Sequence, residues 1–328
     1  VISITQLSGG VILRGWGADR LVAGASAWAR NLGGSPLSIG LTIGACGTSA
    51  PELIVSAVAG LRGNPGLAVG NAIGSNIANN GLILGITAAI YPLRVESETL
   101  KREYPVLMLI MSGSFFMAAD LIYDRPEGWL QLFGLLALVL WMVRFGMRRG
   151  TEDPLAREFA AEIPRDMPTG YAVLWLSVGL IVLPLSSSFL VDGAIFIARS
   201  LHVSEAVIGL TIIALGTSLP ELAAALTSAL RQEDDLAIGN VIGSNMFNIL
   251  GVLGIAAAVH PVEVELLMLQ QDVPVMFMFT VMLFFIAYGI NGRGRISRRS
   301  GLLLLTLFTS YQVLIWMTAT RLPVAPAT

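Results

Sequence analysis

Two glutamates, Glu52 and Glu221, stand in near-identical motifs inside stretches that are apolar enough to lie in a membrane. Residues 39–52, IGLTIGACGTSAPE, align without gaps on residues 208–221, IGLTIIALGTSLPE, with 11 of 14 positions identical. A charged side chain in mid-membrane costs roughly 2.5–3.5 kcal/mol on insertion scales, and ionisable residues there mark function by default. The two glutamates therefore predict a site for a positively charged ligand.

The residues beside each glutamate supply further oxygen atoms. Positions three and four apart on a helix share a face, so each glutamate can converge with a threonine and a serine of its own motif. These are Thr48, Ser49 and Glu52 in the first motif, and Thr217, Ser218 and Glu221 in the second. Every side chain that converges is an oxygen donor.

A proline lies immediately before each glutamate. Proline has no amide hydrogen and clashes with the carbonyl four residues earlier, so Pro51 and Pro220 free the carbonyls of Gly47 and Gly216. Such carbonyls are tolerated in a membrane only where they are buried in protein or line a watery cavity. We therefore expect both helices to be broken near their middles, with carbonyls available as cation ligands.

A second duplicated motif adds hydroxyl and amide groups. GNAIGSNIAN at 70–79 matches GNVIGSNMFN at 239–248, with seven of ten positions identical at the same offset of 169 as the first motif. In each copy a serine and an asparagine are four residues apart and share a helix face. These are Ser75 and Asn79 in the first copy, and Ser244 and Asn248 in the second.

The charge that balances the glutamates must come from outside these segments. The apolar runs 36–60, 65–92, 205–230 and 234–260 contain no lysine or arginine. Calcium takes 6 to 8 oxygens, whereas magnesium sheds water reluctantly and transition metals favour His or Cys ligands. A hard cation such as calcium fits this set, although sodium ions or protons could occupy the same oxygens.

Membrane helices must position these motifs. The 328 residues are 55% hydrophobic and 13% charged, with a mean hydropathy of +0.74, and a helical crossing takes about 20 residues. Ten apolar runs are long enough: 1–31, 36–60, 65–92, 103–122, 126–146, 170–199, 205–230, 234–260, 271–290 and 300–321. We expect an all-α polytopic membrane protein with ten transmembrane helices.

The constant offset of the two motif pairs indicates a duplication. Each half then holds five spans, an odd number, so the halves enter the membrane in opposite orientations, as in transporters with a substrate site near the midplane. We expect an N-terminal five-helix repeat at 1–146, a charged cytoplasmic linker at 147–169 and an inverted C-terminal five-helix repeat at 170–328.

The basic residues predict the orientation of the chain. The connections after spans one, three, five, seven and nine hold 14 lysines and arginines, and the opposite side holds four. The positive-inside rule therefore places the odd-numbered connections in the cytoplasm. We expect a multi-pass protein of the plasma (inner) membrane with both termini extracytoplasmic.

The duplicated motifs resemble those of the cation/calcium exchanger superfamily, G-T-S-x-P-E followed by G-N-x-I-G-S-N, and especially its prokaryotic sodium/calcium exchanger-like branch. The resemblance implies that Glu52 and Glu221 are the central calcium ligands. It also implies that spans one and six slide past the rest to switch access. The remaining calcium and sodium ligands would be backbone oxygens around Ala45, Thr48, Ala214 and Thr217, and the hydroxyls of Ser49, Ser75, Ser218 and Ser244.

Asn79 and Asn248 depart from many members of that family, which carry an acid in at least one of these positions. An amide still offers an oxygen but removes a charge and a titratable group. Potassium dependence is therefore disfavoured, and the driving ion stays open.

The leading hypothesis is a secondary antiporter that exports Ca²⁺ in exchange for Na⁺. It would act in the lipid bilayer as a monomer, without cofactor or nucleic acid, and would not be an enzyme. The first alternative is a Ca²⁺/H⁺ antiporter. A cation channel, and an intramembrane hydrolase that uses the paired glutamates as acid and base, are the others.

Overall fold

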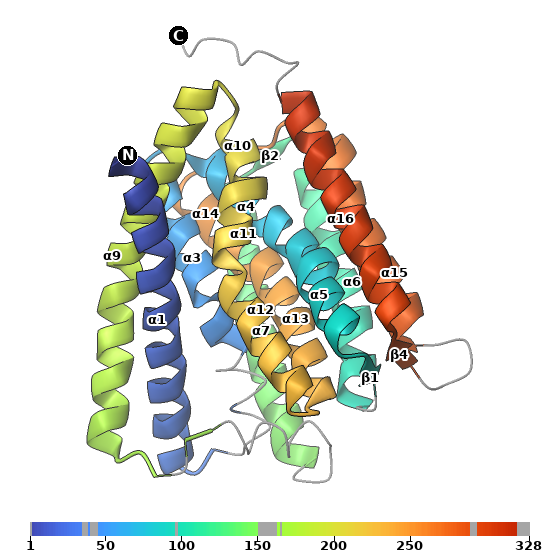
Figure 1. Cartoon of the computed structure of the whole chain (residues 1–328). Coiled ribbons are helices and arrows are strands. Elements are labelled where there is room, and N and C mark those ends of the chain that lie inside the picture. Colours follow the sequence, from blue (N-terminus) through green and yellow to red (C-terminus); the bar gives the residue numbers. More distant parts are fainter. Residues whose placement is uncertain are drawn as a thin grey trace.

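The computed structural model describes residues 2–34, 39, 45–95, 98–149, 163–164, 166–288 and 294–319. Within these ranges the chain is a bundle of helices that run roughly along a common direction, with short strands at the bundle ends (Figure 1). The N-terminal end of α1 and the C-terminal end of α16 lie at the same end of the bundle (Figure 1).

The elements follow the predicted runs in order, with π turns inside several helices. In the first half they are α1 (Ile2–Asn31), α3 (Ala45–Leu61), α4 (Pro65–Ala78), η2 (Asn79–Ile83), α5 (Leu84–Ile90), β1 (Leu93–Val95), α6 (Glu98–Met117), η3 (Ala118–Asp120), β2 (Ile122–Tyr123) and α7 (Arg125–Arg149). In the second half they are α9 (Thr169–Leu201), α10 (Glu205–Ile208), η4 (Gly209–Ile213), α11 (Ala214–Thr217), α12 (Leu219–Leu230), α13 (Asp234–Phe247), η5 (Asn248–Val252), α14 (Leu253–Val259), β3 (Val262–Glu263), η6 (Met268–Asp272), α15 (Val273–Tyr288), β4 (Gly294–Ile296) and α16 (Arg298–Ala319).

Six of the described helices are long and apolar enough to cross a membrane, and the bent pair 205–217 and 219–230 makes a possible seventh span. Each of the other three predicted runs also contains a helix. α1 carries Asp19 and Arg20, α3 is a shorter apolar helix in its described part, and α6 begins among charged residues. The described chain is thus a helical membrane protein, as predicted, and the count of ten spans stays a prediction.

α1 and α9 form a closely packed pair at one side of the bundle (Figure 1). A Cβ atom on Gly24 of α1 would lie 2.4 Å from the backbone nitrogen of Leu176. A Cβ atom on Gly179 of α9 would lie 2.7 Å from Cβ of Leu21. Because only glycine permits this approach, the two long helices pack backbone to backbone, and they meet the rest of the bundle mainly through α3.

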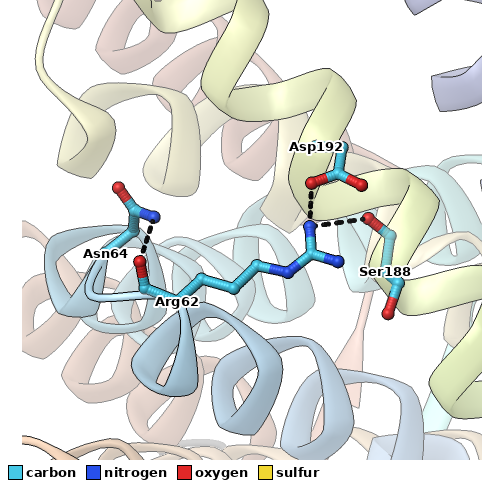
Figure 2. A network of polar contacts seen from close by, with 4 residues as sticks. All are labelled: Arg62, Asn64, Ser188 and Asp192. Carbon is cyan, nitrogen blue, oxygen red and sulfur yellow. Dashed lines mark hydrogen bonds and ion pairs between the residues drawn. The ribbon is translucent and has the colours of Figure 1, made fainter.

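A polar contact joins α9 to the turn between α3 and α4 (Figure 2). The Arg62 guanidinium forms an ion pair with Asp192 and reaches the carbonyl of Ser188 at 3.4 Å. The Asn64 side chain donates to the Arg62 carbonyl at 3.1 Å, which closes the turn. The contact therefore links the α1 and α9 pair to the central helices at a bundle end.

Two short antiparallel strand pairs connect the halves of the chain. β1 pairs with β4 with Arg94 opposite Arg295, and β2 pairs with β3 with Tyr123 opposite Val262. Each pair thus combines one strand from the first half with one from the second. The helical pattern of the sequence did not predict these strands.

Candidate functional site

The second glutamate motif folds as a broken helix. α10, η4 and α11 run to Thr217, the chain bends by 41°, and α12 begins at Leu219. Ser218 occupies the bend with φ −85° and ψ 1°, and Pro220 lies in the first turn of α12, where its missing N–H costs no helical hydrogen bond. The break predicted for span seven is present. In the first motif, residues 40–44 lie outside the described part. From Ala45 to Leu61 α3 runs through Pro51 without a break, so the break predicted beside Pro51 is absent from the described part of span two.

Both glutamates are buried. Glu52 lies on α3 with 1% of its surface exposed, and Glu221 lies in the first turn of α12 with 3% exposed. The unpaired N–H groups of a helix N-terminus favour negative charge nearby, and Glu221 lies in that turn of α12. α3, α4, α12 and α13 contain no lysine or arginine, so a mobile cation can balance this buried negative charge.

Ser49 and Ser218 occupy equivalent positions in the two motifs, 169 residues apart. They are 0% and 2% exposed, and neither hydroxyl oxygen has a hydrogen-bond partner among the described residues. Buried polar atoms in folded proteins nearly always have a partner, so each exception requires an explanation. A cation bound between the motifs would supply the missing contact to both oxygens.

Thr217 and Ser75 meet between the two halves. Thr217 Oγ1 lies 3.2 Å from Ser75 Oγ and 3.1 Å from Asn71 Oδ1. Ser75 Oγ is 3.4 Å from the same amide oxygen, and the Asn71 amide nitrogen donates to Ser56 at 3.3 Å. The structure therefore brings two predicted ligands together on an amide that is itself fixed by α3.

Asn79 and Asn248 each begin a π turn, η2 and η5, and the two turns lie at equivalent positions in the halves. π turns inside α-helices are frequent at functional sites. Each asparagine is 1% exposed, and its Oδ1 atom has no hydrogen-bond partner among the described residues. η5 packs on α3, and η2 packs on α12, so the π turn of each half lies against the glutamate helix of the other half.

The remaining predicted ligands are placed as follows. Ser244 is buried with 1% exposed, on α13. The Ala214 carbonyl accepts a hydrogen bond from Ser218 N at 3.0 Å and lies 3.1 Å from Thr217 Oγ1, whose single proton goes either to it or to Asn71, so a cation would compete with the Ser218 amide for this oxygen. Ala45 is the first residue of α3, and the side chain of Thr48 lies outside the described part of the structure.

Sequence reasoning missed the asparagines that hold the predicted ligands. Asn71 contacts Thr217, while Asn76 and Asn245 accept hydrogen bonds from the amides of the π turns in the opposite halves. A signal was present, because Asn71 and Asn76 recur as Asn240 and Asn245 at the offset of the duplication.

The predicted ligands are chemically uniform. They comprise two carboxylates together with hydroxyl and amide oxygens, and no cluster of three or more His, Cys, Asp or Glu occurs in the part of the chain that the structure describes. All-oxygen sets of this kind suit hard cations, and transition metals favour nitrogen and sulfur ligands. The buried oxygens of the two duplicated motif pairs therefore have the chemistry that a hard cation requires.

Comparisons with known proteins agree with this chemistry. The sequence model of the family described as "Sodium/calcium exchanger protein" matches residues 2–146 and 171–317. Among curated relatives, CaxA of Alkalimonas amylolytica is 47% identical over 94% of this chain and 96% of that protein. The inner membrane protein YrbG of Escherichia coli (strain K12) is 43% identical over 83% of this chain and 84% of that protein.

A solved structure has a similar fold along the whole chain. The sodium-calcium exchanger NCX_Mj soaked with 10 mM Na⁺ and 10 mM Sr²⁺ aligns with a TM-score of 0.67 at 32% identity. The alignment covers 98% of this chain and 99% of that chain.

Proposed function

Because the chain belongs to the sodium/calcium exchanger family, a family of transporters and not of enzymes, we propose that it is a secondary antiporter that exports Ca²⁺ in exchange for Na⁺. The observation that carries this proposal is the set of buried oxygens that the two duplicated motif pairs supply. Glu52 and Glu221 supply two negative charges, and the hydroxyls of Ser49 and Ser218 lack hydrogen-bond partners among the described residues. Two carboxylates balance the charge of one Ca²⁺ ion.

The proposed architecture has ten membrane spans in two inverted repeats, 1–146 and 170–328, joined by a cytoplasmic linker at 147–169. The protein would lie in the plasma membrane with both termini extracytoplasmic and would function as a monomer. Its partners would be the transported ions and the surrounding lipid.

The proposed mechanism depends on competition for shared oxygens. Ca²⁺ and Na⁺ both prefer oxygen ligands, so their occupancy of one site is mutually exclusive when the carboxylates are shared. Alternating access then converts exclusive occupancy into exchange. We propose that α1 and α9, which pack as one unit, move against the central helices to open the site to either side.

Transport in sealed proteoliposomes tests the proposal. An outward Na⁺ gradient should drive ⁴⁵Ca²⁺ uptake, and a protonophore should leave that uptake unchanged. Uptake that follows an imposed pH gradient and ignores Na⁺ would instead indicate Ca²⁺/H⁺ exchange. Flux that follows the membrane voltage with no counter-ion requirement would indicate a channel.

The site assignment is tested by Glu52→Gln and Glu221→Gln, with Glu263→Gln as the matched control because Glu263 is exposed on β3. Either site variant should abolish Na⁺-driven Ca²⁺ uptake, since a single remaining carboxylate leaves the divalent ion unbalanced. The control should transport at the wild-type rate. A site variant with wild-type transport would refute the assignment.

A further inference from the structure

A directed chain of hydrogen bonds leads from the first π turn to α15. Asn79 Nδ2 donates to Asn245 Oδ1 at 3.0 Å, and Asn245 Nδ2 donates to Asn80 Oδ1 at 2.8 Å. Asn80 Nδ2 then donates to Thr280 Oγ1 at 3.0 Å, and that hydroxyl donates to the Met276 carbonyl at 3.0 Å. Every donor in the chain therefore points away from the Asn79 oxygen.

A second, shorter chain of hydrogen bonds leads from the π turn of the second half, η5. Asn248 Nδ2 donates to Asn76 Oδ1 at 3.0 Å. Asn76 Nδ2 lies 3.3 Å from the Asn245 carbonyl and 3.6 Å from the sulfur of Met276. Both chains cross between the halves and both reach α15, although no residue of α15 belongs to the duplicated motifs.

The far end of the first chain sets its direction. A backbone carbonyl can only accept, so the Thr280 hydroxyl proton is directed to Met276 and its oxygen accepts from Asn80. That acceptor fixes the orientation of the Asn80 amide. The Asn80 amide then fixes the orientation of the Asn245 amide, and Asn245 fixes that of Asn79. Reversal of any one amide would oppose two donors or two acceptors, which is costly because all four side chains are at most 1% exposed.

We propose that Thr280, Asn80, Asn245 and Asn76 are positioning residues that hold the amide oxygens of Asn79 and Asn248 toward the transported cation. The two oxygens are the atoms of these amides that lack a hydrogen-bond partner among the described residues. A fixed amide gives the site a neutral oxygen ligand without a third or fourth carboxylate. This inference rests on the proposed cation exchange.

The two chains of hydrogen bonds differ in the residues that end them, and this difference allows a test. The positions equivalent to Asn80 and Thr280 in the other half are Ile249 and Met111. Thr280 therefore ends the hydrogen-bond chain of the Asn79 amide, whereas the equivalent residue in the other half, Met111, has no hydroxyl to do the same. A change at Thr280 should act on the site through Asn79, even though Thr280 contacts none of the predicted ligands in any described hydrogen bond.

The test compares Thr280→Val, which keeps the shape and removes the hydroxyl, with Thr280→Ser, which keeps the hydroxyl. Equilibrium ⁴⁵Ca²⁺ binding to the purified full chain should be about tenfold weaker in Thr280→Val, at the lower end of what outer-shell substitutions cost at metal sites. Thr280→Ser should bind as the wild type does. In an Asn79→Ala background, Thr280→Val should cause no further loss.

If Thr280→Val weakens Ca²⁺ binding equally in the wild-type and the Asn79→Ala backgrounds, its role is structural and the inference is overturned. Wild-type Ca²⁺ binding by Thr280→Val would also overturn it. If Thr280→Val fails to fold, Asn80→Ile replaces it, because isoleucine is the residue that the other half carries there. Normal Ca²⁺ binding by Asn80→Ile would then refute the proposed positioning role.

Loss of binding in Glu52→Gln together with normal binding in Thr280→Val would leave the proposed function standing and remove this inference alone. A wild-type chain that binds neither Ca²⁺ nor Na⁺ would overturn both.

Discussion

Gly74 on α4 allows the first half to approach the broken helix of the second half closely. The substitution Gly74→Ala should force the two apart. An added Cβ would lie 2.6 Å from the Leu210 carbonyl oxygen, 2.7 Å from Leu210 Cα and 2.8 Å from Ala214 Cβ. Two of these atoms are backbone and cannot rotate away. Restoring an ordinary 3.4 Å contact from 2.6 Å requires α4 to retreat from η4 and α11 by about 0.8 Å.

That displacement acts directly on the site because Ser75 is the next residue. Its hydroxyl is 3.2 Å from Thr217 Oγ1, and Asn71 Oδ1, also on α4, is 3.1 Å from the same atom. An opening of about 0.8 Å takes both distances past the hydrogen-bond limit. Two lost bonds at about 0.5–1.5 kcal/mol each give a total of about 1–3 kcal/mol, which corresponds to roughly 5- to 150-fold weaker cation binding. Overpacking should also lower the stability by about 1–3 kcal/mol.

Thermal unfolding in detergent and equilibrium ⁴⁵Ca²⁺ binding would measure the two effects. Gly113→Ala on α6 is the matched control, because a Cβ there meets nothing within 4 Å. Alanine is the better helix former, so the control should be unchanged or slightly more stable. If Gly74→Ala unfolds and binds Ca²⁺ as the control does, the close approach of α4 to η4 does not determine the geometry of the site.

Three further changes have expected outcomes. Asp192→Asn should cost at most about 1 kcal/mol, because the Arg62 and Asp192 side chains keep 34% and 51% of their exposure, and the difference in thermal unfolding should disappear in about 1 M salt. Tyr311→Phe should lower the unfolding temperature through a loss of about 1–3 kcal/mol, since Asp272, only 4% exposed, loses a donor at 2.8 Å. Burial raises the pKa of Glu233 above its ordinary 4.5, so the wild type loses stability as the pH rises through that raised value. Glu233→Gln should therefore unfold at a higher temperature than the wild type near neutral pH, with a difference that vanishes below about pH 4.5.

Much of the site was predictable because its motifs are duplicated in the sequence. A shared offset of 169 between two motif pairs identifies the equivalent positions, and helical spacing places Ser49 beside Glu52 and Ser218 beside Glu221. The proline of each motif was less informative, because Pro220 follows the break at Ser218 whereas the equivalent Pro51 lies inside the continuous helix α3. The identity of the ligand positions was therefore predictable from the repeat, and the break of one helix but not the other depends on packing.

Features that depend on packing between the halves were not predictable in the same way. The Asn79 amide donates to Asn245 across 166 residues, and Asn80 reaches Thr280 across 200. Nothing local distinguishes an asparagine that binds a ligand from one that orients a neighbour. The strands β1 to β4 were missed for a related reason, since each is two or three residues long and exists only by pairing with the other half.

Differences between the two halves affect which access state an exchanger would occupy between transport cycles. If the halves are inverted copies that exchange roles between the two access states, identical halves would give the two states equal energies. The Arg62 ion pair with Asp192 is one contact that the other half does not copy, because the residue equivalent to Asp192 is Ala23. A contact worth up to about 1 kcal/mol changes a two-state ratio by roughly fivefold. Since Arg62 and Asp192 lie outside both duplicated motifs, the preferred resting state can be set independently of the affinity of the ion site.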